Sequence, residues 1–508
     1  MKRYLILFLI AVCSSWTINA QNQLITIDAN IGKPKDAMSL ETNILNGNEN
    51  IHYMYRTAYG KGFASNNQKS HWIFTVNSRD NTNSFSEILI PKEYFFVDCF
   101  ENENEILALY YQNDTKENKY TLYLNTYPKG SNSYTWEPKQ ISSFPYDEKD
   151  KVSFSTRTSP DKSKFGLIVL VTSGRKNIYK GALVTAFNNQ GEALWDNELN
   201  LEFINKTFSL EDYIINNDGN TYFSIISYTE EKKQRLDQKL HIYVVTENNI
   251  SDFSEDISFG YLSQAKSKIL KNGDLFVGGY YRENHKEFEK GCYALLFDTK
   301  RENTKSLVNQ DFKNYNERNV GSLFSQEFAN QKYQVTCEDI FELDNGNVVL
   351  LGEQRAVVEN IDQKGFRTYV HYTKNIMYNC FNPSGEMVDF KMFKKVQARP
   401  ARYYVNNFKK LGISYHPFVK ENNVYLLFND NINNYIGKRG ATFTGAKKSY
   451  CTVLMKINES GEEDRKVVIN SKIQKKFFYE PLFIEEDGAI VVDMTSKALM
   501  LEKLSLDF

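Results

Sequence analysis

Charged and imidazole side chains recur at a fixed distance before a series of tight polar turns in this 508-residue chain. Among the positions at or beside the seventh residue before each turn glycine, or before the residue that replaces it, the candidates are Asp212, Lys266, Asp339, His416 and Glu480. If the segments that carry them surround one axis, these side chains meet at the mouth of a channel. Oxygen ligands from several segments would suit Ca²⁺, which takes about six to eight of them. We therefore predict a speculative binding site for a cation or polar ligand, with channel water as the alternative.

Catalysis by the same residues has weaker support. Acids from different segments could form a general acid and base pair, and Glu211-Asp212 and Glu338-Asp339 are acidic pairs at equivalent positions. Neighbours on a strand point to opposite faces, so only one acid of each pair can reach a channel. The chain has no G-x-S-x-G, H-E-x-x-H or P-loop motif, and its six histidines have no ligand spacing. The sequence therefore predicts no catalytic residue.

A second group of candidates is basic. Residues 391–412 contain seven Lys and Arg and no acid, with aromatic residues between them, and residues 431–448 add four more without an acid. The candidates for one basic face are Lys394, Lys395, Arg399, Arg402, Lys438 and Arg439. Such a face could hold an anionic glycan, lipid headgroups or an acidic envelope protein. Nucleic acid fits the charge but not the compartment, and a solvated loop balanced by nearby acids is the alternative.

The elements that must position these residues are β-hairpins. Apolar runs flank a polar turn in five segments, which are 213–223, 269–277, 340–349, 419–427 and 483–491. Asp-Gly and Asn-Gly between apolar runs are a strong hairpin signal because both central residues of a type I′ turn need φ > 0. Weaker versions at 95–107 and 159–170 bring the number of turn centres to seven. A hairpin that recurs along the chain predicts a repeat architecture.

This pattern resembles the β-propeller superfamily. The resemblance implies an all-β propeller over residues 71–508 with seven blades, six or eight being the alternatives. Pairing of N-terminal and C-terminal strands would close the ring and remove exposed sheet edges. Residues 21–70 would then be an N-terminal arm or the closing-strand region. The repeated motifs of individual propeller families are absent, so the resemblance assigns no site residue, and an array of β-sandwiches is the competing architecture.

Residues 1–20 have the order of a secretory signal peptide: Lys2 and Arg3, a short apolar core, and Ala20 at the expected cleavage site. A lipid anchor would need Cys13, but Val12 fits poorly before a modified cysteine. No later stretch is apolar enough for a transmembrane helix. The other five cysteines are widely spaced and lie in or beside apolar runs, which predicts buried, unpaired thiols. We expect an exported protein of the periplasm or cell surface.

Three functions follow as hypotheses. The first is a non-enzymatic binding or interaction protein, because the repeat supplies a scaffold and no loop carries a nucleophile–base or metal constellation. The second is a carbohydrate-active hydrolase or lyase with carboxylates at the channel mouth. The third is a structural component of the cell envelope. The sequence requires no cofactor, although Ca²⁺ would suit the channel residues.

Overall fold

The computed structural model describes residues 22–505 apart from several internal segments. The segments that it leaves undescribed are 1–21, 29–38, 49–50, 60–67, 78–81, 132, 148, 174–178, 201–206, 232–233, 285–288, 313–332, 402–403, 405–407, 410–411, 437–440, 445–449, 471–476, 486–487, 495–497 and 506–508. The predicted signal segment lies outside the described residues. Within the described part of the chain, no helix is long and apolar enough to cross a bilayer.

The described strands form eight antiparallel sheets. The first sheet in the chain contains β2 (Ser39–Asn48), β3 (Ile51–Tyr59), β4 (Gln68–Asn77) and β5 (Thr82–Ile88). The second contains β6 (Tyr94–Glu101), β7 (Glu105–Asp114), β8 (Lys119–Pro128) and β9 (Lys139–Pro145). The third contains β10 (Asp150–Thr158), β11 (Lys164–Ser173), β12 (Tyr179–Asn188) and β13 (Ala193–Asn200). The fourth contains β14 (Thr207–Ile215), β15 (Thr221–Glu231), β16 (Gln234–Val245) and β17 (Ile250–Asp256).

The remaining sheets follow the same order. The fifth contains β18 (Tyr261–Ile269), β19 (Leu275–Arg282), β20 (Glu289–Asp298) and β21 (Asn303–Asp311). The sixth contains β22 (Gln334–Glu342), β23 (Val348–Ile361), β24 (Arg367–Phe381), β25 (Met387–Phe393) and the added strand β26 (Gln397–Ala401). The seventh contains β27 (Tyr415–Lys420), β28 (Asn423–Asn431), β29 (Tyr450–Ile457) and β30 (Glu463–Asn470), with a 3₁₀ turn at Ile432–Tyr435 after β28. The eighth joins β31 (Phe477–Glu485), β32 (Gly488–Met494) and β33 (Ala498–Ser505) to β1 (Asn22–Asp28) from the other end of the chain.

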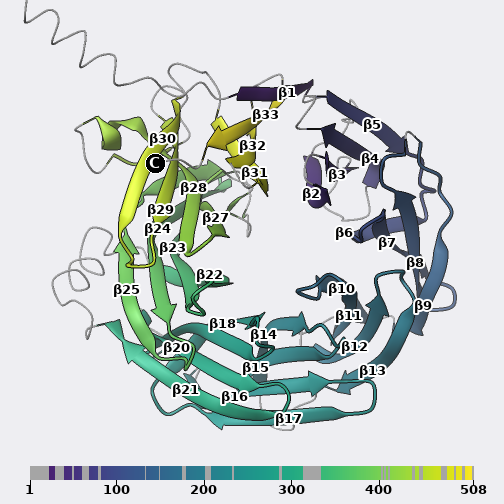
Figure 1. The fold of residues 1–508 in the computed structure, drawn as a ribbon. Helices are drawn as coiled ribbons and strands as arrows, with labels where there is room; N and C mark the ends of the chain where they lie inside the picture. The colour runs from purple at the N-terminus through teal and green to yellow at the C-terminus, as the bar shows by residue number, and fades with distance from the viewer. Residues whose placement is uncertain are drawn as a thin grey trace, which may run out of the picture.

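The sheets follow one another around a central opening, with the first strand of each sheet nearest to it (Figure 1). Contacts between first strands join β2 to β6, β6 to β10, β10 to β14, β14 to β18 and β18 to β22, and β31 to both β27 and β2. The N-terminal strand β1 pairs antiparallel with β33, as the sequence analysis expected of the two ends. The arrangement is all-β and propeller-like.

All seven turn motifs of the sequence lie between the first and second strands of a sheet. The structure adds an eighth sheet, β2–β5, which the turn count did not include. Asn46-Gly47 lies near the end of β2, but three more polar residues, 48–50, separate it from the apolar run of β3, whereas the second apolar run of the other hairpins follows the turn closely. The pairing of β2 with β3 depends on the contacts of this sheet with the neighbouring sheets, and a local sequence pattern does not predict such contacts.

The core lies between the faces of successive sheets. One cluster joins the fifth and sixth sheets through residues such as Phe276, Tyr280 and Leu350, and another joins the sixth and seventh through Tyr378 and Tyr415. The cysteines after Cys13 are buried in this core as free thiols, namely Cys99, Cys292, Cys337, Cys380 and Cys451. The prediction of buried, unpaired thiols is confirmed.

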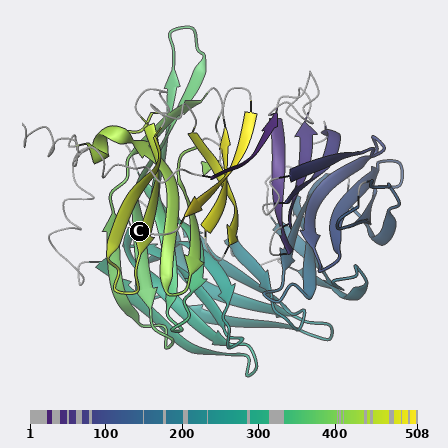
Figure 2. The ribbon, with the colours of Figure 1, turned by 45° about the horizontal axis from the view of Figure 1, so that its top comes forward.

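The sixth sheet departs from the others. Its β23–β24 hairpin extends past the neighbouring strands, and β26 pairs with the extended part of β24. In Figure 2 this hairpin is the green one that projects beyond the ring. The added strand brings the chain after β25 back over the sheet, and this return positions one of the two lysines compared below.

Candidate functional site

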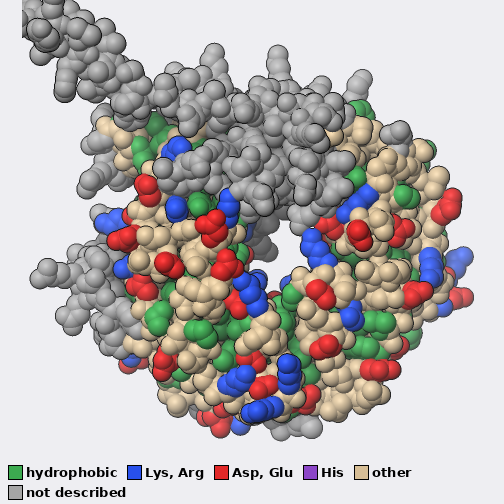
Figure 3. All heavy atoms as spheres, viewed as in Figure 1, with side chains coloured by type: hydrophobic (Ala, Val, Ile, Leu, Met, Phe, Trp, Pro, Cys, Tyr) green, Lys and Arg blue, Asp and Glu red, His purple; other side chains and the backbone are tan. Residues whose placement is uncertain are grey.

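The predicted channel residues lie on first strands. Asp212 is on β14, Lys266 on β18, Asp339 on β22, His416 on β27 and Glu480 on β31. The register counted from the turns therefore identified the strands nearest the central opening. Figure 3 shows several Lys and Arg side chains bordering this opening, with acidic side chains interspersed over the surface around it. Only the strand position of Glu480 is described, so its side chain has no structural account.

A β-bulge recurs in these strands. Six described first strands shift register against their second strands, and in five of them the residue after a shift is Asp98, Asp212, Gln264, Asp339 or Glu480. A bulge places an extra residue in one strand and re-aims the side chains beside it. Three of these side chains reach the first strand of the next sheet. The amide of Ser267 donates to Asp212 Oδ2 at 2.9 Å, that of Cys337 donates to Gln264 Oε1 at 2.8 Å, and the Thr156 hydroxyl donates to Asp98.

Asp212 therefore links two sheets. Besides accepting from Ser267, its carboxylate lies 3.6 Å from the guanidinium of Arg157 on β10. Asp339 differs, because no described donor hydrogen-bonds to it and the amine of Lys409 lies 3.9 Å away. Among the described residues no group of three or more His, Cys, Asp or Glu side chains could hold a metal ion. The geometry thus gives Asp212 a structural role and offers no described cage for Ca²⁺.

His416 is the fourth channel candidate. Burial, together with the nearby positive charges of Lys409 and Lys395, lowers its pKa to about 3. At neutral pH the imidazole is therefore uncharged and adds no cation to the channel.

Lys266 and Lys268 form a second feature of the inner strands. They are two residues apart on β18 and so project from the same face of that strand. Neither amine makes a hydrogen bond or an ion pair with any described residue. Burial lowers the pKa of Lys268, and the attraction of Glu342 and Asp339 only partly offsets this. The sequence analysis included Lys266 but missed Lys268, which stands five residues before the turn glycine Gly273.

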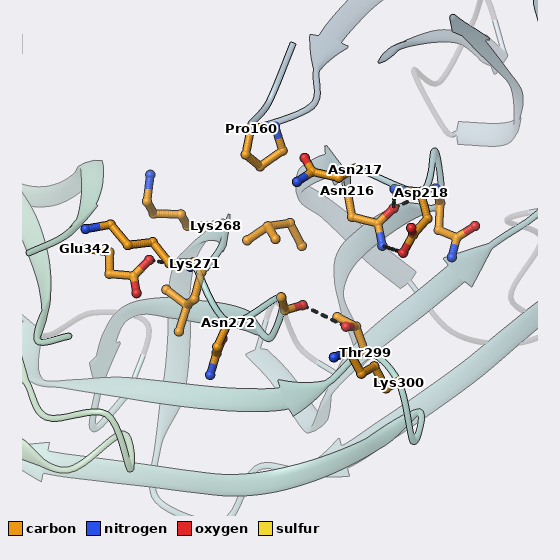
Figure 4. A pocket seen from close by; sticks show the side chains of 14 residues that line it. Pro160, Asn216, Asn217, Asp218, Lys268, Lys271, Asn272, Thr299, Lys300 and Glu342 are labelled. Atoms are coloured by element: carbon orange, nitrogen blue, oxygen red, sulfur yellow. Dashed lines mark hydrogen bonds between the residues drawn. The ribbon is translucent and has the colours of Figure 1, made fainter. Parts of the chain in front are cut away.

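Lys268 lies in a pocket of about 510 Å³. The hairpin turns of the third, fourth and fifth sheets and the end of β22 build it together (Figure 4). Its lining is Pro160, Asn216, Asn217, Asp218, Asn220, Lys268, Ile269, Leu270, Lys271, Asn272, Gly273, Thr299, Lys300 and Glu342. Asparagine amides, three lysines and two carboxylates surround the volume, and Ile269 and Leu270 supply buried apolar surface. The volume falls in the range of small-molecule sites, about 300–1,000 Å³.

The pocket owes its shape to the turns that the sequence predicted. Asn216 Oδ1 accepts from the amides of Asp218 and Asn220, and Asn272 Oδ1 accepts from the amide of Asp274, so these asparagines hold their own turns. Gly219 and Gly273 adopt φ of +93° and +90°, which side-chain-bearing residues rarely adopt. Sequence reasoning found these turns but could not show that three of them converge on one cavity.

The predicted basic face is only partly accounted for. Lys394 is exposed and Arg399 is partly buried, whereas Arg402, Lys438 and Arg439 lie outside the described residues. Lys395 is not on an exposed face, because only 2 % of it is accessible. Its amine ion-pairs with Glu353 and donates to Thr373 Oγ1 at 3.1 Å and Gln397 Oε1 at 2.8 Å. The expectation that Lys395 contacts a ligand on the surface is therefore wrong.

Lys395 belongs to a buried network of charges in the sixth sheet. Burial alone would raise the pKa of Glu353, but the attraction of Lys395 and Arg355 outweighs it and leaves this pKa below its ordinary value. Arg355 also contacts Glu338 at 2.7 Å. Burial raises the pKa of Glu338 against the attraction of Arg355. The sequence analysis named Glu338 within an acidic pair but had no signal for its partner.

A Ser–His–Asp chain lies in the fourth sheet. Ser227 Oγ is 2.8 Å from His241 Nε2, and His241 Nδ1 is 2.9 Å from Asp252 Oδ1. This is the hydrogen-bond order of a nucleophile, a base and an orienting acid. Ser227 is completely buried, however, so no acyl group can reach its hydroxyl. We interpret the chain as a structural bridge across β15, β16 and β17.

Comparisons with known proteins give no assignment. No family model matches the chain, and no curated protein matches it. Among solved structures, the polysaccharide lyase Uly1 is 11% identical over 96% of this chain and 98% of its own, with a TM-score of 0.36. The WD40 domain of SCAP from fission yeast is 10% identical over 92% and 95%, with a TM-score of 0.32. A GH43 β-1,3-galactosidase is 9% identical over 80% and 88%, with a TM-score of 0.26. These similarities assign no activity to this chain.

Proposed function

We propose that the chain is an eight-bladed β-propeller, closed by the pairing of β1 with β33, that serves as an exported binding protein. The eight sheets and the contacts between their first strands support the ring, and the order of residues 1–20 supports export. The ligand is a small polar molecule that binds in the pocket described above.

One observation carries the binding proposal. The pocket combines a volume of about 510 Å³ with a partly buried lysine whose amine has no acceptor among the described residues. Partial burial disfavours the charged form of Lys268, and no described side chain compensates with an ion pair, so stability alone gives no reason to keep a lysine at this position. A ligand that fills the pocket would supply the missing acceptor.

A thermal-shift screen tests the proposal. Residues 21–508 would be heated with neutral and acidic oligosaccharides, because a ligand at 100 times its Kd stabilises the native state by about 2.7 kcal/mol. Asn217→Trp should reduce or abolish the shift, since Asn217 is an exposed residue in the pocket lining and the indole would occupy part of the volume that the ligand needs. Gln190→Trp, on an exposed turn outside the lining, is the matched control. A shift that survives Asn217→Trp would place the ligand elsewhere.

The competing function is a carbohydrate-active hydrolase or lyase. The raised pKa of Glu338, on a first strand beside Asp339, favours it because a protonated carboxyl can serve as a general acid. Incubation with a panel of polysaccharides would show new reducing ends or unsaturated products for an enzyme. Loss of these products in Glu338→Gln would support this second function, and their absence from the wild type would exclude it for that panel.

A further inference from the structure

We propose that the ligand of the pocket is a carboxylate-bearing saccharide and that Lys268 contacts its carboxylate. This inference rests on the proposed binding function and names the chemical class of the ligand. It depends on three features of the pocket: an unpaired cation, a small excess of positive charge, and hydrogen-bonding groups of both kinds.

The cation is distinguished by comparison with its neighbours. Lys271 also lines the pocket, but its amine donates to Asp344 Oδ1 at 2.8 Å. Lys305, on the same sheet, donates to both carboxylate oxygens of Asp274 at 2.8 Å. Lys268 is more buried than either of these lysines, yet its amine has no such acceptor among the described residues. An anion bound in the pocket would give the Lys268 amine the kind of acceptor that Lys271 and Lys305 already have.

The charge balance favours one carboxylate group in the pocket over a phosphate dianion. Three lysines and two carboxylates line the pocket, so its formal charge is one unit positive. Glu342 and Asp218 would repel a phosphate dianion more strongly than a monovalent carboxylate. No arginine belongs to the lining, so the planar fork that holds phosphate oxygens in pairs is absent from it.

The remaining polar groups suit hydroxyls, which both donate and accept. The Asn217 carbonyl oxygen already accepts from the amide of Asp161, whereas its NH₂ group donates to no described residue. One oxygen of Glu342 accepts from the amide of Lys271 at 2.6 Å, which leaves the other available as an acceptor. A polyol can use the NH₂ donor and the carboxylate acceptor together. Figure 4 shows Lys268, Asn217 and Glu342 around the same volume, from three different sheets.

Isothermal titration calorimetry tests the inference with three probes: trigalacturonate, maltotriose and inorganic phosphate. The proteins are the wild type, Lys268→Met and the control Lys290→Met, which removes one lysine charge from β20 of the same sheet, outside the lining. Trigalacturonate should bind the wild type more tightly than either other probe. Lys268→Met should weaken its binding by about 10- to 100-fold, as expected for a charged hydrogen bond, while Lys290→Met should change the Kd by less than about threefold. Melting curves of each variant show whether it is folded.

The outcomes separate the inference from the function on which it rests. If maltotriose binds as tightly as trigalacturonate and Lys268→Met binds both normally, the pocket still binds saccharides but the carboxylate contact is wrong. If phosphate binds more tightly and displaces trigalacturonate, the ligand class is wrong. If none of the probes binds the folded wild type, both the inference and the proposed function are contradicted.

Discussion

Two lysines in neighbouring sheets are partly or wholly buried, and they differ in what surrounds the amine. The amine of Lys395 donates to three acceptors, which belong to Glu353, Thr373 and Gln397. Lys268 has none of these partners in the described chain, and a pocket lies beside it instead. Removing one partner of a fully paired buried charge is strongly destabilising, whereas a partly buried charge without a partner already has a cost in free energy and needs another explanation. The comparison therefore distinguishes a lysine with a structural role from one for which we propose a ligand.

The largest loss of stability should follow the substitution of Lys395, the lysine whose amine is fully paired. Lys395→Met leaves Glu353 buried with one countercharge fewer, and removal of one partner from a buried pair typically costs about 3–5 kcal/mol. Urea unfolding should show a decrease of this size in the free energy of unfolding. The double variant Lys395→Met with Glu353→Gln should recover part of the loss. A change below about 1 kcal/mol in Lys395→Met would contradict the structural role.

A buried histidine should make stability depend on pH. Burial lowers the pKa of His71 to about 3, from an ordinary value of 6.5, and its Nδ1 contacts the Tyr55 hydroxyl at 3.1 Å. The unfolded chain therefore takes up a proton below pH 6.5 that the folded chain does not. The contribution of His71 to stability is complete above pH 6.5 and falls by up to about 1.4 kcal/mol for each unit down toward pH 3.

The variant His71→Asn isolates this effect. Between pH 7.5 and pH 5 the wild type should lose about 2 kcal/mol more than the variant in the free energy of unfolding. Parallel pH profiles for the two proteins would contradict this account, because they would mean that folding does not lower the pKa of His71.

Asp212 and Asp339 extend the comparison to two carboxylates that differ in their hydrogen-bond partners. Asp212 accepts a backbone hydrogen bond from the next sheet and faces Arg157, so Asp212→Ala should cost about 1–2 kcal/mol. Asp339 accepts from no described donor and has Lys409 at 3.9 Å, so Asp339→Ala should cost less than about 0.5 kcal/mol. Thermal or urea unfolding of the pair checks the order. Equal losses of stability in the two variants would contradict the different roles that we assign to Asp212 and Asp339.

The smallest change in stability should follow the substitution of Lys268. Without a ligand, Lys268→Met should be as stable as the wild type or up to about 1 kcal/mol more stable, because it removes a buried unpaired charge. The measurement is the same urea titration that is used for Lys395→Met. A loss above about 1 kcal/mol would mean that Lys268 supports the fold and would end the contrast between the two lysines.

Local patterns in the sequence predicted the all-β class, the seven hairpin turns and the strands that carry the channel residues, since each depends on neighbours in the chain. The eighth sheet was not predicted because three more polar residues, 48–50, follow Asn46-Gly47, so its second apolar run does not follow the turn as closely as it does in the other hairpins. The burial of Lys395 escaped because its partner Glu353 is 42 residues away and its own segment is rich in basic residues. The bulges and the pocket depend on register and on the convergence of three sheets, which one sequence does not specify.

The measurement that tests the central claim most directly is a crystal structure of residues 21–508 with trigalacturonate. The account predicts density for the ligand in the pocket of the hairpin turns, with a carboxylate oxygen within about 3 Å of Lys268 Nζ. A ligand bound elsewhere, for example near Lys394 and Arg399, with the Lys268 pocket filled only by water, would contradict the account.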